Sequence, residues 1–278
     1  MLHIFRCIQS NNQSQGFYDN LACTKLDANG IPLRPYQILR GVYPLTCPVG
    51  STKLYPLFGL KSHGGVDRGS YYREPGYFDT EYPDVTWRQF IEIDSSGGLG
   101  VDVVSDREVL PCTEGCPDGT KHFIKRRYWH NISAIVKGEE WNYARCRDYI
   151  GARERALVAE NVKIGDKIFL SDSTGVSSGH HVHDCLKWST ADGDGIHTNN
   201  GYFGAFDFAP FYENRFVIDV VRERRLAEEK AEEVARLEAQ IKASQLTLIQ
   251  ILTKFVFLLQ QQIQNLAKGL GGFLKGRN

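Results

Sequence analysis

The sequence has no excess of charge of either sign. Its 33 Lys and Arg residues balance 33 Asp and Glu residues, so the formal net charge at pH 7 is zero. A neutral chain lacks the long-range field that draws strongly basic proteins to nucleic acid. The stretch richest in Arg and aromatic side chains, residues 137–160, also carries Glu and Asp throughout. It is typical of a solvated insertion or a short helix, and we expect no nucleic-acid partner.

The sequence also lacks a long apolar run. A membrane-spanning helix needs about 18 or more consecutive apolar residues. The most apolar segment, residues 246–259, is interrupted by Gln250, Thr253 and Lys254, so we predict no transmembrane helix. Residues 1–15 lack the basic start and the apolar stretch of a secretory signal. We therefore expect no export by the general secretory route, and the sequence assigns no compartment.

The number of cysteines is odd. The chain has seven, and the closely spaced pair Cys112 and Cys116 has no second pair at the distance that a zinc ribbon requires. A zinc site made of cysteines is not predicted.

Residues 1–215 contain all ten prolines and many Gly, Asp, Asn and Ser clusters between short apolar runs. Such punctuation is typical of turns between strands. The runs at 90–93, 101–104, 123–125 and 167–170 are short, and several alternate apolar with polar residues as half-buried strands do. We predict a mainly β domain with an antiparallel sheet over residues 1–215.

Residues 216–278 have a different composition, with no proline and an early part rich in Glu, Lys, Arg and Ala. Their apolar residues follow steps of three, four and seven, which predict a long amphipathic or coiled-coil helix ended by Gly269, Gly271 and Gly272. We expect self-association through this stripe or docking on the sheet domain, with a membrane-surface role or attachment to a larger assembly as alternatives. The stripe comprises Val234, Leu237, Ile241, Leu248, Leu252, Phe255, Leu259 and Leu266.

Three of the eight histidines, His180, His181 and His183, fall within four residues. Because residues i and i+2 of a strand share a face, His181 and His183 can direct their imidazoles into one site. His63 and Asp67 lie four apart with two glycines between them, so their side chains can converge on the same ion. Imidazole and carboxylate ligands that leave one position to water are typical of a catalytic zinc site.

Four phrases follow one another along the chain: FGLKSHGGVD at 58–67, YWHNIS at 128–133, VKIGDKI at 162–168, and SDSTGVSSG at 171–179 followed directly by HHVH at 180–183. In this order they resemble the lysostaphin/LytM-type zinc metallo-endopeptidases (peptidase family M twenty-three), which cleave peptide cross-links in bacterial peptidoglycan. The resemblance covers roughly residues 13–215. It implies an antiparallel β-sheet metallopeptidase domain with zinc ligands His63, Asp67 and His183.

The same resemblance implies two catalytic histidines beside the ligands, His130 and His181. We assign His181 as the general base and His130 as the stabiliser of the tetrahedral intermediate. The phrase NGYFGAFD at 200–207 resembles the endings of phage and phage-like members. The chain departs from the family at Asp184, where an aromatic residue is usual, and in its long segments 105–122 and 137–160, which we expect to reshape the substrate groove.

These observations predict a zinc-dependent endopeptidase that hydrolyses peptide cross-links of bacterial peptidoglycan with a metal-activated water, followed by a C-terminal helical tail. The alternative is a non-catalytic cell-wall-binding or virion-structural module with the same fold. The presence of all three ligands and both flanking histidines favours catalysis. Without a secretory signal, delivery in a phage particle or release on lysis would bring the enzyme to the wall.

Overall fold

The computed structural model describes residues 23–24, 34–39, 45–47, 63–82, 84–109, 112–114, 122–196, 198, 204–206 and 215–275. They belong to two compact units, Met1–Val221 and Arg222–Asn278. The predicted boundary at 215/216 precedes helix α3 (Val217–Lys275), whereas the division between the units falls inside this helix. The first half of the phrase at 58–67, residues 58–62, and most of the phrase at 200–207 lie outside the described residues.

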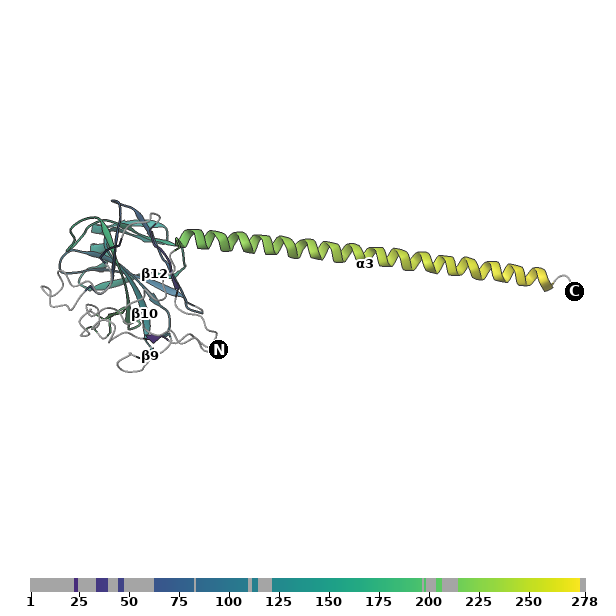
Figure 1. Cartoon of the computed structure of the whole chain (residues 1–278), viewed down its shortest axis with the longest axis horizontal. Helices are drawn as coiled ribbons and strands as arrows, with labels where there is room; N and C mark the ends of the chain where they lie inside the picture. Colours follow the sequence, from purple (N-terminus) through teal and green to yellow (C-terminus); the bar gives the residue numbers. More distant parts are fainter. Residues whose placement is uncertain are drawn as a thin grey trace. The chain divides into compact units, whose positions relative to one another are not determined.

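An antiparallel sheet of eleven strands forms the first unit (Figure 1). Its main path runs β12–β7–β8–β10–β14–β4–β3, and β5, β11, β13 and β15 branch from it. The prediction of a mainly antiparallel β protein with a long C-terminal helix is confirmed. The strands of the sheet are β3 (Leu45–Cys47), β4 (Val66–Gly69), β5 (Pro75–Tyr77), β7 (Trp87–Ile93), β8 (Leu99–Ser105), β10 (Phe123–Val136), β11 (Glu139–Asn142), β12 (Arg155–Val162), β13 (Lys167–Ser171), β14 (His181–Ser189) and β15 (Ala205–Phe206). Two small sheets pair β1 (Cys23–Thr24) with β9 (Cys112–Glu114), and β2 (Arg34–Pro35) with β6 (Thr80–Glu81).

The core lies where β8 and β10 run side by side. Every residue of β8 is buried, and Ile91 on β7 and Leu186 on β14 are fully enclosed beside it. Burying β-branched and other large aliphatic side chains is the main favourable term in folding. The four runs predicted as strands lie within β7, β8, β10 and β13.

Strand β10 is kinked near its middle. Its first part pairs with β8 and β14, and its second part pairs with β13 and β11. The pairing with β8 shifts register between Tyr128 and Asn131, and the intervening His130 has a positive φ of 68°. A bulge of this kind bends the strand and redirects one side chain, here that of His130.

Three consecutive basic residues of β10 are buried: Lys125, Arg126 and Arg127. Alternation along the strand sends Arg126 to one face, where its guanidinium lies 2.6 Å from Asp79 and 2.7 Å from an oxygen of Asp184. Lys125 and Arg127 point to the other face and both pair with Asp102. Buried charges require such partners.

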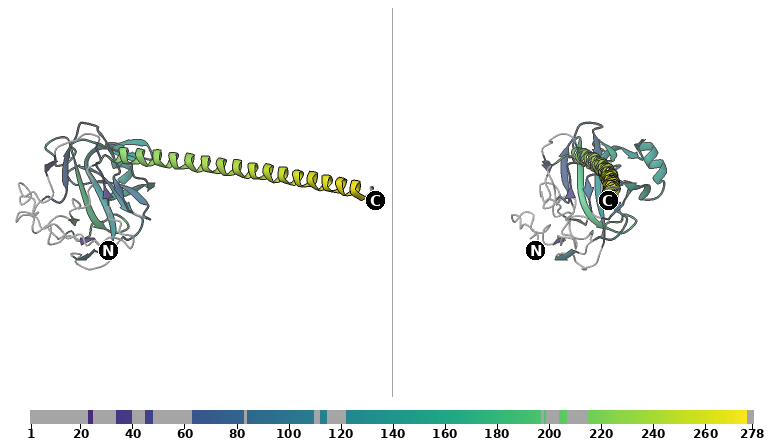
Figure 2. Two further views of the ribbon diagram at one scale, coloured as in Figure 1. Left: turned by 45° about the vertical axis from the view of Figure 1, so that its right-hand side comes forward. Right: turned by 90° about the vertical axis from the view of Figure 1, so that its right-hand side faces the viewer.

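The insertion at 137–160 forms β11, helix α2 (Tyr143–Ile150) and the start of β12. Asn142 caps the helix by accepting a hydrogen bond from the Arg145 backbone N–H. Cys146 and Ile150 face the sheet, and most other positions are exposed. The right-hand view of Figure 2 shows α2 at the periphery of the strands. The segment predicted as a solvated insertion or short helix is therefore a strand followed by a helix. The helix packs its buried residues against the sheet and exposes most of its other positions.

Helix α3 begins in the first unit, where Val217 and Val220 pack against Tyr36. From residue 225 to residue 266 every position is exposed. The predicted end at Gly269 is wrong, because the helix continues to Lys275. Each glycine lowers helix propensity by about 1 kcal/mol relative to alanine but still supplies its backbone hydrogen bond. Among the described residues, α3 contains a window of mean hydropathy 1.3 that is long and apolar enough to cross a membrane by length and composition.

Candidate metal centre

Three predicted ligands meet between adjacent strands. Asp67 on β4 and His183 on β14 are directly paired across the antiparallel ladder, and His63 lies just before β4. His63 Nε2 lies 2.8 Å from His183 Nδ1 and 3.1 Å from Asp67 Oδ1, and His183 Nδ1 lies 3.0 Å from the same oxygen. Two strands and the segment before one of them therefore hold one oxygen and two nitrogen atoms in a compact triangle.

These three atoms fit a divalent metal ion. In a tetrahedral zinc site with bonds of about 2.0–2.1 Å, ligand atoms lie about 3.3 Å apart. The observed separations of 2.8–3.1 Å are within about half an ångström of that value. The donor set of two imidazoles and one carboxylate suits zinc, although other divalent ions accept the same ligands.

The close approach of the two strands at the site depends on Gly65. A Cβ at this position would lie 2.7 Å from the Asp184 carbonyl oxygen and 2.8 Å from His183 Nε2. Both distances are below van der Waals contact, so a side chain here would force β4 away from β14. The glycine between His63 and Asp67 thus provides space for the His183 ring as well as a turn.

The second nitrogen of the His183 ring faces away from the triangle, toward Gly65 and Cys185. The buried Cys185 thiol is a hydrogen-bonding partner of His183. Metal-binding histidines commonly use their second nitrogen in this way, and the contact fixes the ring orientation. Sequence analysis did not single out Cys185, although its position two residues after His183 places it on the same face of β14.

The electrostatic environment keeps Asp67 ionised. Burial by itself would raise the pKa of this carboxyl group, but hydrogen bonds and charge from His183 and His63 outweigh burial and hold the pKa far below its usual range. The carboxylate is therefore in the form that binds a metal ion throughout the physiological pH range.

His130 lies beside the three candidate ligands. Its ring centre is 4.5 Å from that of His181 and 6.3 Å from that of His183. Its Nδ1 lies 2.8 Å from the Thr174 carbonyl oxygen. Because a carbonyl only accepts, Nδ1 carries the hydrogen and Nε2 of the neutral ring is an acceptor. Burial, together with the charges of His181 and His183, lowers the pKa of His130 to about 4, so the ring is neutral at pH 7.

His181 has the same tautomer as His130. Its Nδ1 lies 2.8 Å from the Gly179 carbonyl oxygen, which only accepts, and 3.1 Å from Ser177 Oγ. Its Nε2 lies 3.8 Å from Asp67 Oδ1. His181 therefore turns its free nitrogen toward the triangle. The neighbouring His180 instead pairs with Asp172 at 3.0 Å and is 46% exposed, so it is outside the group, as strand alternation predicts.

Thr174 holds the His130 side of the site together, and sequence analysis did not assign it a role. Its hydroxyl donates to the Asn131 carbonyl oxygen at 2.8 Å and accepts from the Leu99 N–H at 3.1 Å, while its own carbonyl accepts from His130. The next residue, Gly175, has φ of +73°, and a Cβ there would lie 2.6 Å from the Gly98 Cα. The Thr-Gly pair in the phrase at 171–179 is the sequence signal for this contact.

Asp184 faces away from the ligands, as alternation predicts. It is fully buried and pairs with Arg126 of β10 on the face of the sheet opposite to the candidate ligands. Burial, together with the negative charge of Asp79, raises its pKa, while Arg126 acts in the other direction. Asp184 is therefore one carboxylate of a buried ionic cluster with Arg126 and Asp79.

The arrangement can perform acid–base chemistry next to a metal ion. Three donor atoms can hold the ion, and two imidazole nitrogens that accept protons lie beside it. Such a combination is suited to activating water for attack on a polarised carbonyl or phosphoryl group.

No protein-family model matches the chain, and no curated protein matches it in sequence. Several solved structures match part of it, among them two peptidases. A zinc containing peptidase from Vibrio cholerae is 17% identical with a TM-score of 0.33, over 59% of this chain and 42% of that protein. The catalytic domain of the antimicrobial peptidase lysostaphin from Staphylococcus simulans is 18% identical with a TM-score of 0.30, over 66% of this chain and 92% of that domain. The chain thus spans less than half of the Vibrio cholerae protein.

Proposed function

We propose that the protein is a zinc-dependent endopeptidase that hydrolyses peptide cross-links of bacterial peptidoglycan. The observation that carries the proposal is the triangle of His63, Asp67 and His183 atoms, 2.8–3.1 Å apart, with two imidazoles beside it. The substrate class comes from the resemblance of the sequence phrases to peptidoglycan-cleaving endopeptidases.

The three ligands and the general base have defined tasks in this proposal. His63 Nε2, Asp67 Oδ1 and His183 Nδ1 hold the ion. A bound zinc would polarise the scissile carbonyl and lower the pKa of a water from about 15.7 to about 7. His181 Nε2 accepts the proton that the attacking water loses, and the imidazolium returns it to the amide nitrogen as the C–N bond breaks.

The choice of His181 as the base follows from the environments of the two rings. The pKa of His130 is lowered to about 4, so its Nε2 is a weak proton acceptor. His181 Nε2 is close to the ligand set, at 3.8 Å from Asp67. For His130 to stabilise an oxyanion, its Nε2 must first gain a proton, because Nδ1 already donates to Thr174.

Metal content and hydrolysis measured on the same preparations test the proposal. We expect about one zinc per wild-type chain, with release of peptide ends from purified peptidoglycan that chelation abolishes and added zinc restores. His183→Ala should lose both zinc and hydrolysis. The matched control is His180→Ala, which removes a neighbouring histidine outside the ligand group and should retain both.

The same measurements separate the alternatives. Zinc-loaded protein that sediments with peptidoglycan but releases no peptide ends from any wall would contradict the proposal and favour a non-catalytic wall-binding or virion-structural module. Equal loss in the His180→Ala and His183→Ala variants would show that the chosen triangle is not the metal site.

A further inference from the structure

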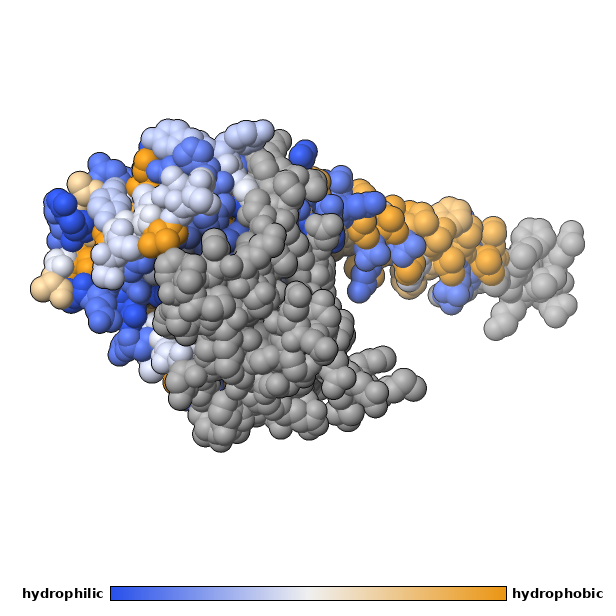
Figure 3. Space-filling model, turned by 60° about the vertical axis from the view of Figure 1, so that its left-hand side comes forward, coloured by the Kyte–Doolittle hydropathy of each residue, from blue (hydrophilic) through white to orange (hydrophobic). Residues whose placement is uncertain are grey.

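The C-terminal part of α3 presents a large apolar surface. Eleven large aliphatic or aromatic side chains between residues 248 and 266 are 44–68% exposed, and all of them except Phe257 form one surface. Figure 3 shows apolar residues gathered along this part of the helix, beyond a polar stretch. Soluble proteins seldom leave a surface of this size exposed unless it binds something. The ten residues, called the apolar face below, are Leu248, Ile249, Ile251, Leu252, Phe255, Val256, Leu258, Leu259, Ile263 and Leu266.

The apolar face occupies one side of the helix. With a rotation of about 100° per residue, its ten members fall within about half of the helix circumference. The opposite half carries Thr247, Gln250, Thr253, Lys254, Gln260, Gln261, Gln264 and Asn265. Three residues break the separation: Leu246 and Phe257 on the polar half, and Gln262 on the apolar half. The segment is therefore amphipathic with a wide apolar face.

The charge of the chain changes sign along α3. Residues 222–238 carry six acidic and five basic side chains, whereas the 40 residues from 239 to 278 carry five basic side chains and no acidic one. The whole chain is neutral, but its C-terminal 40 residues have a formal charge of +5. The five basic residues are Lys242, Lys254, Lys268, Lys275 and Arg277.

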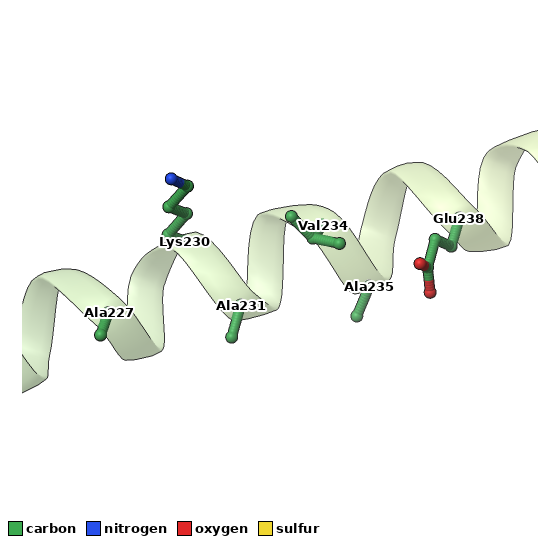
Figure 4. Close-up of a pocket in the computed structure, with 6 residues that line it drawn as sticks. All are labelled: Ala227, Lys230, Ala231, Val234, Ala235 and Glu238. Carbon is green, nitrogen blue, oxygen red and sulfur yellow. The ribbon is translucent and has the colours of Figure 1, made fainter.

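The preceding part of the helix has a different surface. A shallow hollow there is lined by Ala227, Lys230, Ala231, Val234, Ala235 and Glu238 (Figure 4). Small side chains and charges of both signs meet at this hollow, so it does not extend the apolar face. The change in surface character occurs between Glu238 and Leu246.

Charge favours an anionic lipid surface over a parallel second copy as the occupant of the apolar face. A second copy packed in parallel along the same face would bring two segments of charge +5 together, with no acidic residue on either to offset them. An anionic lipid surface offers apolar depth to the wide face and negative headgroups to the lysines. We propose that residues 246–266 bind the surface of an anionic phospholipid bilayer, with the apolar face inserted and Lys254 directed to the headgroups.

The polar residues determine that the helix lies on the bilayer and does not cross it. Lys254 is near the middle of the segment, and Gln250 and Gln261 lie on the same side of the helix. In a spanning helix these side chains would reside in the hydrocarbon, where a lysine is strongly disfavoured. In a helix parallel to the surface they remain in water while the other side is inserted.

Vesicle binding by the full chain tests this inference and does not depend on the proposed peptidase activity. Protein is sedimented with vesicles of phosphatidylcholine alone or with about 30% phosphatidylglycerol. We expect at least about tenfold tighter binding to the anionic vesicles, weakened by added salt. Lys242→Gln/Lys254→Gln should weaken binding to anionic vesicles about thirtyfold, at about fivefold per lysine. Its matched control, Lys230→Gln/Arg236→Gln, removes two charges from the preceding part of the helix and should bind as wild type.

A second pair of variants tests the apolar face. Leu252→Gln/Phe255→Gln should abolish binding, while Gln250→Ser/Gln261→Ser on the polar half should retain it, with helix content checked by circular dichroism. Binding that is absent, or equal for the two kinds of vesicle, would overturn the inference. Lipid-free dimers that Leu252→Gln/Phe255→Gln dissociates, without vesicle binding, would identify a second copy as the occupant. Retention on vesicles through an alkaline carbonate wash would show a helix that crosses the bilayer.

Discussion

Replacing the buried Arg126 tests how much a buried ion pair contributes to the stability of the sheet unit. Its Nη2 lies 2.6 Å from Asp79 Oδ2 and 2.7 Å from Asp184 Oδ1, and all three side chains are fully buried. Arg126→Met keeps most of the side-chain volume but removes the guanidinium that contacts both carboxylates, leaving Asp184 only the more distant Arg68 at 3.8 Å. Removing one partner of a buried ion pair costs about 3–5 kcal/mol.

This cost is large compared with the stability of a domain. Folded domains are stable by about 5–15 kcal/mol, and for 150–250 residues each kcal/mol lowers the melting temperature by about 2–4 °C. We therefore expect Arg126→Met to lower the melting temperature by roughly 6–20 °C in calorimetry or circular dichroism. The melting transition of the sheet unit is the relevant one, because Arg126, Asp79 and Asp184 all belong to that unit.

The matched control is an exposed pair with equally short contacts. Arg73 lies 2.8 Å from Glu140, with 43% and 37% of the two side chains exposed. Exposed pairs contribute about 0–1 kcal/mol, so Arg73→Met should shift the melting temperature by no more than about 4 °C. The triple variant Asp79→Asn/Arg126→Met/Asp184→Asn removes the buried charges together and should recover part of the loss. Equal shifts for Arg126→Met and Arg73→Met would refute the reasoning, because burial would then make no difference.

Three further predictions concern the site and the buried ion pairs of Asp102 on β8 with Lys125 and Arg127 on β10. Gly65→Ala places a methyl group 2.7 Å from the Asp184 carbonyl oxygen and should separate Asp67 from His183, lowering zinc affinity at least about tenfold in a chelator competition; unchanged affinity would contradict the close strand contact. Thr174→Val removes both hydrogen bonds of the hydroxyl and should cost about 1–3 kcal/mol in urea unfolding, with Thr174→Ser as the control that keeps them. Burial would raise the pKa of Asp102, but Arg127 and Lys125 outweigh it and hold the pKa well below the usual 3.8. The stability that this carboxylate provides is therefore present above about pH 4 and lost as pH falls below it, so the slope of stability against pH under acid conditions should be smaller in Asp102→Asn.

Local pattern was sufficient to predict the strands, whereas the assignment of His63, Asp67 and His183 as metal ligands also drew on resemblance and stays a prediction. Val101 and Val103 alternate with other residues at the period of a strand, and β8 is a central strand. His181 and His183 share a face because they are two apart, and Asp67 is placed opposite His183 by the ladder between β4 and β14. His130 was reached only through resemblance, since its position depends on a bulge that no local pattern signals.

The features that sequence analysis missed depend on contacts between distant segments. The run Lys125–Arg126–Arg127 is hydrophilic by composition. Its burial follows from partners on other parts of the chain, including Asp79, Glu92, Asp102, Asp184 and Gly193. Thr174 holds β10 to β8 through residues 43 and 75 positions away. No periodicity encodes such pairings, because each partner becomes a neighbour only after the sheet has formed.

Strand β14 carries two incompatible sets of side chains on its two faces. His181, His183 and Cys185 belong to the metal side, and Asp184 belongs to the Arg126 side. A slip of one residue would exchange the faces, moving an imidazole against Arg126 and a carboxylate out of the ionic cluster. A misregistered pairing would therefore lose contacts on both faces of β14. Changes in chain length around the site are better tolerated in the loop at 172–180 than within the strand. Strand β14 therefore helps to fix the register of the sheet and also carries His183, one of the proposed ligands.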